Sequence, residues 1–154
     1  MIKSLPWEEI LPIWQHKLWP DRKSAIESNS AMKLSGGYDI ENMKTVPTFV
    51  GYFIDDNLVG VFSGHKCSEN DYRVRGFWVE PKYRKQGIGT ELLQSLINQG
   101  KKEGCSIVWG YPKSTSWNIF KRLGFKLASD WEPSETSKEN AYCILELNEQ
   151  NKQR

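Results

Sequence analysis

One stretch, residues 79–90, decides the fold of this chain; it reads VEPKYRKQGIGT. Val79 ends a run of β-branched and aromatic residues, and Thr90 already belongs to an amphipathic helical pattern. Gly87 and Gly89 lie one residue apart, so the backbone can turn tightly and no side chain blocks the approach of a ligand. The first N–H groups of the helix are unpaired and lie at its positive end. The stretch therefore predicts an anion-binding turn between a strand and a helix.

The residues beside the two glycines narrow the kind of anion. Arg84 and Lys85 add positive charge, which suits a diphosphate. The P-loop motif needs a Lys directly after its last Gly, and the dinucleotide-binding motif needs a third Gly where Leu92 stands. What remains is the pattern Arg84-x-x-Gly87-x-Gly89. Its alternative interpretation is an ordinary strand-to-helix turn with solvated basic residues.

Working outward, the pattern predicts a sheet covered by helices. A strand–helix–strand crossover ordinarily makes parallel strands, so 105–111 should run parallel to 72–79. The strongest helical pattern follows the glycine loop, and a second helix is expected at 114–123. We expect strands at 48–54, 58–67, 72–79, 105–111, 125–129 and 141–147.

The N-terminal part predicts two helices. Ser4 can cap the first helix, and Pro12 should kink it or split it in two. Trp7 and Trp14 are spaced in this helix so that they lie on one buried face. The spacing favours a core position for both tryptophans, and a wall around a cationic or flat substrate is the alternative. A second short helix is expected at 21–32, followed by a loop as far as Pro47.

Composition limits the class of protein. The chain has 154 residues, which is one domain by size, and its 21 basic and 19 acidic residues give a net charge of +2. A nucleic-acid binder ordinarily shows a concentrated basic stripe, so that class rests here only on the mild positive charge. No apolar run is long enough to span a bilayer, and the N-terminus does not read as a secretory signal. Two His and three scattered Cys predict no metal site and a cytoplasmic protein.

Two motifs together carry a family resemblance. The pattern V-x-P-x-Y-R-x-x-G-I-G at 79–89 resembles the acetyl-CoA motif of the GNAT N-acetyltransferase superfamily. The stretch WNIFKRLGF at 117–125 resembles that family's helix ending in (Y)-x-x-L-G-F. The resemblance implies a single α/β (α+β) domain at 1–147 and a frayed tail at 148–154. Its mixed, mostly antiparallel sheet would have about six to seven strands, splayed between the central parallel strands and flanked by helices.

The resemblance also implies a reaction. Acetyl-CoA would be the co-substrate, and its acetyl group would pass directly to an amine of a small molecule or peptide. The N–H of Val79 would stabilise the oxyanion, and amides from Gln86 to Thr90 would hold the pyrophosphate. For Asn118, a solvated helix position is the alternative. The cofactor-binding residues implied are Phe77, Trp78, Val79, Arg84, Lys85, Gln86, Gly87, Ile88, Gly89, Thr90 and Asn118.

Two proton transfers need side chains. An alkyl ammonium has a pKa of about 10.4 and must lose a proton before it attacks. Glu80, acting directly or through water, is the first candidate for the base, and an exposed strand-end carboxylate is its alternative interpretation. His65 and Glu69 are weaker candidates.

The acid is less clear, because Phe120 stands where many family members have a Tyr and cannot donate a proton. Tyr111 and Ser116 can replace it, although Tyr111 also suits a packing role. The departing thiolate can also leave without a dedicated acid. Phe120 motivates an alternative function, an acyl-CoA-binding module without turnover. For either function we expect a monomer or homodimer.

Overall fold

The computed structural model describes residues 1–135, 137 and 139–147, which form one seven-stranded sheet of order β1-β2-β3-β4-β5-β7-β6. Only β4 and β5 pair in parallel within it. The predicted mixed, mostly antiparallel sheet is confirmed. The strands are β1 (Ile2–Ser4), β2 (Thr48–Ile54), β3 (Asn57–Lys66), β4 (Asp71–Val79), β5 (Ile107–Gly110), β6 (Lys126–Leu127) and β7 (Cys143–Glu146).

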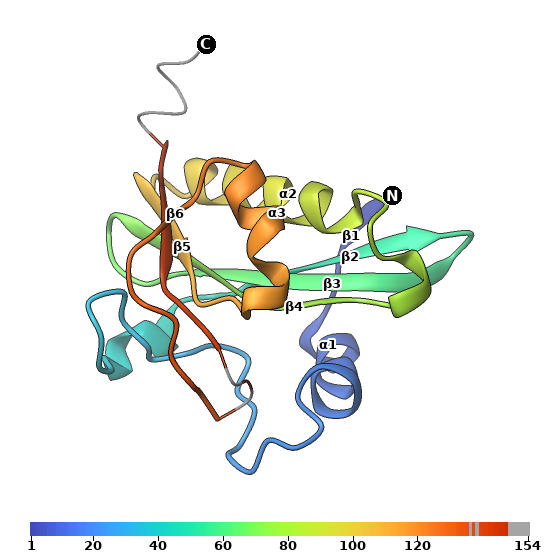
Figure 1. The fold of residues 1–154 in the computed structure, drawn as a ribbon, viewed down its shortest axis with the longest axis horizontal. Coiled ribbons are helices and arrows are strands. Elements are labelled where there is room, and N and C mark those ends of the chain that lie inside the picture. The colour runs from blue at the N-terminus through green and yellow to red at the C-terminus, as the bar shows by residue number, and fades with distance from the viewer. Residues whose placement is uncertain (136, 138, 148–154) are drawn as a thin grey trace.

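Helices cover both faces of the sheet (Figure 1). One face carries α2 and α3, and the other carries α1 with the N-terminal segment that follows it. The described helices are α1 (Trp7–Ile13), the π-helix η1 (Trp14–Leu18), the short 3₁₀ helices η2 (Ile40–Lys44), η3 (Pro81–Tyr83) and η4 (Ser114–Ser116), and the α-helices α2 (Ile88–Lys102) and α3 (Trp117–Arg122).

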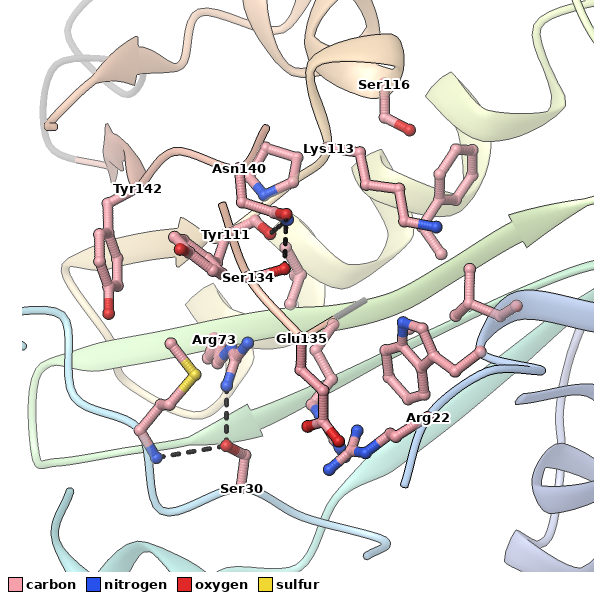
Figure 2. Close-up of a pocket in the computed structure, with 18 of the residues that line it drawn as sticks. Arg22, Ser30, Arg73, Tyr111, Lys113, Ser116, Ser134, Glu135, Asn140 and Tyr142 are labelled. Carbon is pink, nitrogen blue, oxygen red and sulfur yellow. Dashed lines mark hydrogen bonds between the residues drawn. The ribbon is translucent and has the colours of Figure 1, made fainter. Parts of the chain in front are cut away.

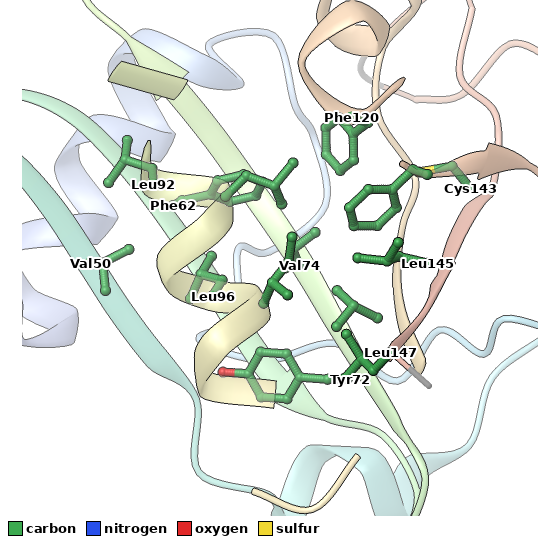
Figure 3. Close-up of a cluster of buried hydrophobic side chains, with 14 of the residues drawn as sticks. Val50, Phe62, Tyr72, Val74, Leu92, Leu96, Phe120, Cys143, Leu145 and Leu147 are labelled. Carbon is green, nitrogen blue, oxygen red and sulfur yellow. The ribbon is translucent and has the colours of Figure 1, made fainter. Parts of the chain in front are cut away.

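The larger part of the core lies between the sheet and α2 (Figure 3). Leu92 and Leu96 of α2 are fully buried and belong to the same cluster as Val50, Phe62 and Val74 of the sheet. Burial of one such aliphatic side chain contributes about 1.5–3 kcal/mol. The apolar face that follows the glycine loop in the sequence therefore fixes α2, and with it the loop, against the sheet.

A second cluster packs α1 and η1 against the opposite face. Its centre is Trp14, which is fully buried and stacks against Trp7, Trp19 and Phe49. The indole Nε1 of Trp14 donates a hydrogen bond to the carbonyl oxygen of Gly76 at 2.9 Å. The structure therefore places Trp7 and Trp14 in the core, in agreement with their helical spacing.

Strand β4 changes its surroundings halfway along its length. It pairs with β5 only from Asp71 to Val74, because β5 ends at Gly110 and Pro112 soon follows without an N–H group. On its other edge β4 continues along β3, with a register shift in the ladder. The shift is a β-bulge at Gly76, which has φ of 78°. The second half of β4 is consequently separated from β5.

The N-terminal predictions were partly wrong. Ser4 pairs with Val50 in β1 and does not cap a helix; the N-cap of α1 is Pro6. Pro12 lies inside α1, and a π-helical turn continues the helix to Leu18. The missed strand is short and lies at the sheet edge, where pairing depends on a distant segment.

The helix predicted at 21–32 is absent from the described residues. Side chains there bond to the backbone of turns and of other segments, which competes with helical hydrogen bonds. Arg22 Nη2 donates to the Ala25 carbonyl at 3.1 Å, and Asn29 Nδ2 donates to the Thr45 carbonyl at 2.7 Å. The predicted loop as far as Pro47 contains the short helix η2. The tail at 148–154, expected to be frayed, lies outside the described residues.

The bulge predicts that position 76 tolerates only glycine. A Cβ atom at Gly76 would collide with the ring of Trp14, whereas a Cβ at Gly104, which also has positive φ, would meet open space. Gly76→Ala should therefore cost about 2–5 kcal/mol, from left-handed strain plus overpacking, and Gly104→Ala about 1–2 kcal/mol, from strain alone. Urea unfolding of both variants measures the difference. Equal losses of stability would contradict this account of the bulge.

Candidate functional site

Two cavities open where β4 and β5 separate. The first, here called the loop cavity, has a volume of about 630 Å³ and lies between the end of β4, residues 83–90 and the start of α3. The second, here called the arginine cavity, measures about 690 Å³, has Arg73–Phe77 of β4 in its wall and is closed by loops from both ends of the chain (Figure 2). Four residues line both cavities: Leu18, Phe77, Lys113 and Ser116.

The loop cavity brings together almost all of the predicted cofactor-binding residues, although their roles stay predictions. Gln86 is the exception, because it does not line the cavity and its Nε2 donates to the Lys82 carbonyl at 3.3 Å. The predicted residues that line the loop cavity are Phe77, Trp78, Val79, Arg84, Lys85, Gly87, Ile88, Gly89, Thr90 and Asn118.

Gly87 and Gly89 are each needed in the loop, for different structural reasons. Gly87 is the N-cap of α2, with φ of 88° and no side chain to cover the first amides of the helix. A Cβ there would meet open space. At Gly89, a Cβ would lie 2.6 Å from Cζ of Phe77 and 2.8 Å from Cδ1 of Ile119, so this glycine lets α2 approach β4 and α3. The positive end of a fifteen-residue helix consequently faces the cavity bare.

Two arginine side chains, those of Arg84 and Arg122, form hydrogen bonds with residues at the two ends of this loop. Nε of Arg84 donates to the Val79 carbonyl at 2.8 Å, which holds the side chain against the end of β4. A guanidinium has five N–H donors, so others remain for an anion. Arg122, at the end of α3, lines the cavity and places Nη1 3.5 Å from the Thr90 hydroxyl. The Lys121-Arg122 pair inside the second motif was the sequence signal for this second cation.

The backbone N–H of Val79 points toward the opening between the strands. The next amide, of Glu80, donates to the Val59 carbonyl of β3 at 2.8 Å. Successive N–H groups along a strand point to opposite edges, so the Val79 N–H points away from β3, toward the side from which β5 has diverged. Val79 itself lines the loop cavity. This direction is the one that an oxyanion donor needs.

The predicted bases lie outside both cavities. Glu80 follows Val79 but lines neither cavity, so a role in proton transfer requires an intervening water. His65 is fully buried, and burial together with the charges of Arg73 and Arg75 lowers its pKa to about 3. Glu69 lines neither cavity. The structure therefore keeps His65 neutral and away from any acceptor.

Of the predicted acids, Tyr111 lies in the arginine cavity alone. Its hydroxyl donates to Oε1 of Glu132 at 3.0 Å, and its ring packs on Tyr142. Burial and this hydrogen bond raise the pKa of Tyr111 to about 12, which makes it a weak proton donor. Phe120 is buried against Phe62 and Phe125, and its ring, which has no proton to donate, lines the arginine cavity alone.

Lys113 and Ser116 lie where the two cavities meet. Figure 2 shows the side chain of Lys113 reaching into the cavity from the segment after β5. Burial, and then the charge of Arg84, lower the pKa of Lys113. Lys113 was not among the residues predicted from the sequence, because only the tertiary structure brings the residue after Pro112 to the place where the two cavities meet.

Arg73 and Arg75 were also missed. In the sequence they alternate with Val74, which resembles the solvated face of an edge strand. Instead, β4 is central, and both arginines are buried under the N-terminal segment at the wall of the arginine cavity. No signal in the local pattern distinguishes these two cases.

Two kinds of feature are absent from the part of the chain that the structure describes. No helix there is long and apolar enough to cross a membrane. No group of three or more His, Cys, Asp or Glu side chains in residues 1–135, 137 and 139–147 is arranged to hold a metal ion.

Comparison with protein families gives one match. A family model described as the acetyltransferase (GNAT) family matches residues 6–125. The match covers most of the chain and includes α1, the glycine loop and the motif that ends at Phe125.

Solved structures share the fold at low sequence identity. An aminoglycoside 6'-N-acetyltransferase complexed with coenzyme A is 13% identical over 96% of this chain and 97% of that chain, with a TM-score of 0.68. An IAA acetyltransferase from Bacillus cereus ATCC 14579 is 13% identical over 95% and 98%, with a TM-score of 0.68. The PaiA N-acetyltransferase from Thermoplasma acidophilum, in complex with coenzyme A, is 21% identical over 65% and 60%, with a TM-score of 0.56. These likenesses show the fold.

Proposed function

This chain belongs to the GNAT acetyltransferase family, whose members act in acetyl-CoA-dependent acyl transfer, and we propose that its acceptor is an amine of a small molecule or peptide. The observation that supports this most is the pair of joined cavities. One presents the bare start of α2, and the other offers a separate space for an acceptor. The alternative, a binding module without turnover, is not favoured by the comparisons.

In this proposal the loop cavity holds acetyl-CoA. The first amides of α2 bind the pyrophosphate, with Arg84, Lys85 and Arg122 as cations around it. The pantetheine arm lies between the second half of β4 and the segment after β5, where it replaces the missing strand pairing. The thioester then reaches Phe77, Lys113 and Ser116 at the junction of the cavities.

The chain's own groups would assist the transfer as follows. The Val79 N–H donates to the acetyl oxygen as negative charge develops there. Glu80, through a water, accepts the proton that the amine must lose. Lys113 donates a proton to the departing sulfur, because it lines both cavities. The hydroxyl of Tyr111 is not chosen, because it already donates to Glu132. Transfer is direct, from the thioester to the amine.

Binding of CoA tests the loop cavity. Lys82 and Lys85 lie in the same loop and are both exposed, but only Lys85 lines the cavity. Lys85→Gln should weaken CoA binding about threefold to tenfold, whereas Lys82→Gln, the matched loss of charge, should change it less than about twofold. Calorimetry gives both constants. If neither CoA nor acetyl-CoA raises the melting temperature of the unaltered chain, the proposed function is wrong.

The base is tested by substitution of its carboxylate. Glu80→Gln should lower kcat/KM about a hundredfold, because the group that accepts the proton of the amine has been replaced. Release of free thiol from acetyl-CoA with an amine panel measures the rates. Glu69→Gln is the control and should leave kcat/KM unchanged. A Glu80→Gln chain that keeps the kcat/KM of the unaltered chain would exclude Glu80 as the base.

The acid is tested by the pH dependence of turnover. Lys113 must be protonated to act, so activity should fall as pH rises through its pKa, which burial and Arg84 lower. Lys113→Met should remove this alkaline limb and lower kcat by about ten- to a hundredfold. Lys113→Arg keeps the charge without titrating, so it should also lose the limb but retain more of kcat. An unchanged alkaline limb in both variants would assign the proton to another group.

A further inference from the structure

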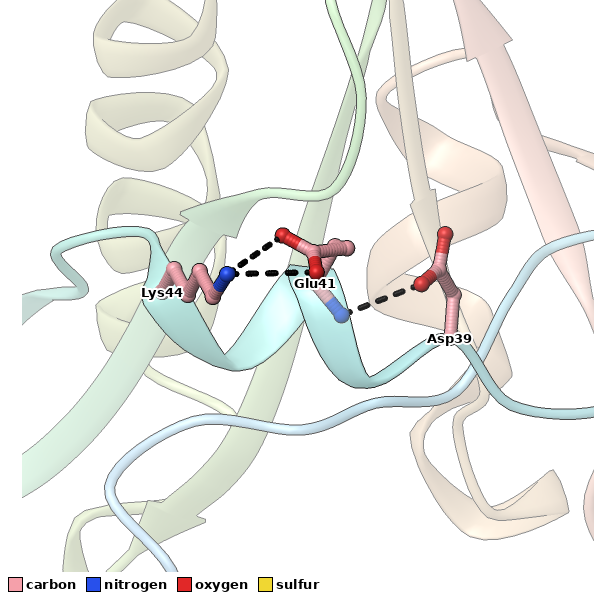
Figure 4. A network of polar contacts seen from close by, with 3 residues as sticks. All are labelled: Asp39, Glu41 and Lys44. Atoms are coloured by element: carbon pink, nitrogen blue, oxygen red, sulfur yellow. Dashed lines mark hydrogen bonds and ion pairs between the residues drawn. The ribbon is translucent and has the colours of Figure 1, made fainter.

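The arginine cavity contains two buried cations, Arg73 and Arg75, which form no ion pair within 4 Å among the described residues; the carboxylate of Glu27, farther away, offsets the burial of Arg75 only in part. Arg73 and Arg75 lie on the same face of β4 and are only 7% and 8% exposed. In residues 1–135, 137 and 139–147 the ion pair within 4 Å is Lys44–Glu41, which includes neither arginine (Figure 4). Removing a guanidinium from water without a counter-charge is unfavourable. Such a pair is therefore expected where a ligand supplies the opposite charge.

Each guanidinium is held in place by neutral groups. Nη1 of Arg73 donates to the Ser30 hydroxyl at 2.8 Å, and its plane lies over Trp109 at 5.1 Å. Nη1 of Arg75 donates to the Glu27 carbonyl at 2.9 Å, and the group lies over Trp14 at 4.8 Å. These contacts orient both guanidinium groups without neutralising their charge.

Donors remain unused. Nε of Arg73 is buried and has no hydrogen-bond partner among the described residues. A guanidinium carries five N–H donors, and buried donors are nearly always satisfied in a native structure. Nε itself has almost no accessible surface, but Arg73 lines the cavity, so an oxyanion there can accept from the other N–H groups of the guanidinium, whose planar geometry it matches.

The remaining charges of the cavity reinforce this polarity. Arg22 and Lys113 also line it. Its two carboxylates, Glu132 and Glu135, are on exposed residues and already accept hydrogen bonds, from the Tyr111 hydroxyl and from Ser24 respectively. Figure 2 shows Arg73 deeper in the fold, beside β4, and Glu135 on the overlying loop near Arg22. The interior of the cavity is thus cationic and its rim is mixed.

We propose that the acceptor amine carries an anionic oxygen group, a carboxylate or a phosphate, which binds Arg73 and Arg75 while the amine faces the junction of the two cavities. This proposal rests on the proposed function and specifies its substrate class. Arg75 and Arg73 precede Phe77 by two and four residues, which is at most about 7 and 13 Å along a regular strand and less across the bulge at Gly76. Several bonds therefore separate the amine from the anionic group.

The same charges would assist the chemistry. Cations close to an ammonium disfavour its charged form and lower its pKa, so an amine at the junction loses its proton more easily. They also disfavour acceptors that carry several positive charges. An anionic tail compensates for this repulsion during binding, whereas a polyamine has no compensating group. The cavity therefore selects an acidic acceptor on both grounds.

Matched acceptor pairs test the proposal in the unaltered chain. Thiol release from acetyl-CoA is compared for ε-aminocaproate and its amide, for γ-aminobutyrate and its amide, and for phosphoethanolamine and ethanolamine, with spermidine as the polycation. The acid of at least one pair should have a kcat/KM at least about tenfold above its neutral partner, from charge-assisted hydrogen bonds. The carboxylate and phosphate arms identify which oxyanion fits. Amides or spermidine used as well as the acids would overturn the proposal.

Variants locate the effect. Arg73→Gln should reduce the preference for acid over amide by about tenfold or more, through KM for the acid, while KM for acetyl-CoA stays within about twofold. Arg73→Lys keeps the positive charge and should therefore retain part of the preference for acid over amide. Lys44→Gln removes one positive charge from a 73% exposed side chain outside both cavities and should leave the preference unchanged. A preference that survives intact in a folded Arg73→Gln chain would contradict the assignment.

The outcomes separate this proposal from the proposed function. If no amine in the panel causes release of thiol, the result contradicts the proposed function. The anion site is then tested separately, by calorimetry with ε-aminocaproate and with inorganic phosphate. Binding to the unaltered chain that is lost in Arg73→Gln would support the site. No binding of either anion would overturn it.

Discussion

The separation of β4 from β5 is the constraint on which the rest of this structure depends. The two strands pair in parallel as far as Val74 and Gly110, and then β5 ends while β4 continues. The bulge at Gly76 and the hydrogen bond from Trp14 to its carbonyl keep the second half of β4 in its own register with β3. Both cavities lie beside this opening, so the packing of the Trp14 ring against Gly76 and Arg75 is coupled to the shape of the arginine cavity.

The opening divides the positive charge into two groups with different partners. On one side the start of α2 faces the loop cavity, and the loop cations Arg84 and Lys85, which also line it, are exposed to solvent. On the other side Arg73 and Arg75 are buried. Exposed cations attract a diphosphate at little cost in desolvation, whereas buried ones have been stripped of water in advance. The second group is therefore the more selective of the two.

The two cavities also differ in how the chain builds them. The loop cavity takes most of its wall from consecutive residues, 77–90 and 113–122, and these contain the motifs that resemble the family. The arginine cavity combines residues from the N-terminal segment 18–38, the strand residues 73–77, residues from 111–120, and Glu132, Ser134, Glu135, Asn140 and Tyr142. Fold likeness at 13% identity extends over nearly the whole chain, yet it carries no information on acceptor choice, which depends on side chains from these separate segments.

The sequence by itself determined the sheet, the helix α2 and most of the loop cavity, because hydrophobic periodicity and glycine positions are local properties of the chain. It did not determine the N-terminal segment, where 21–32 folds as turns through contacts with distant residues, or the edge strand at Ile2–Ser4. Burial of Arg73 and the position of Lys113 were likewise decided only by the tertiary structure. An alternating strand reads the same at a sheet edge and at its centre, and only packing against another part of the chain distinguishes the two.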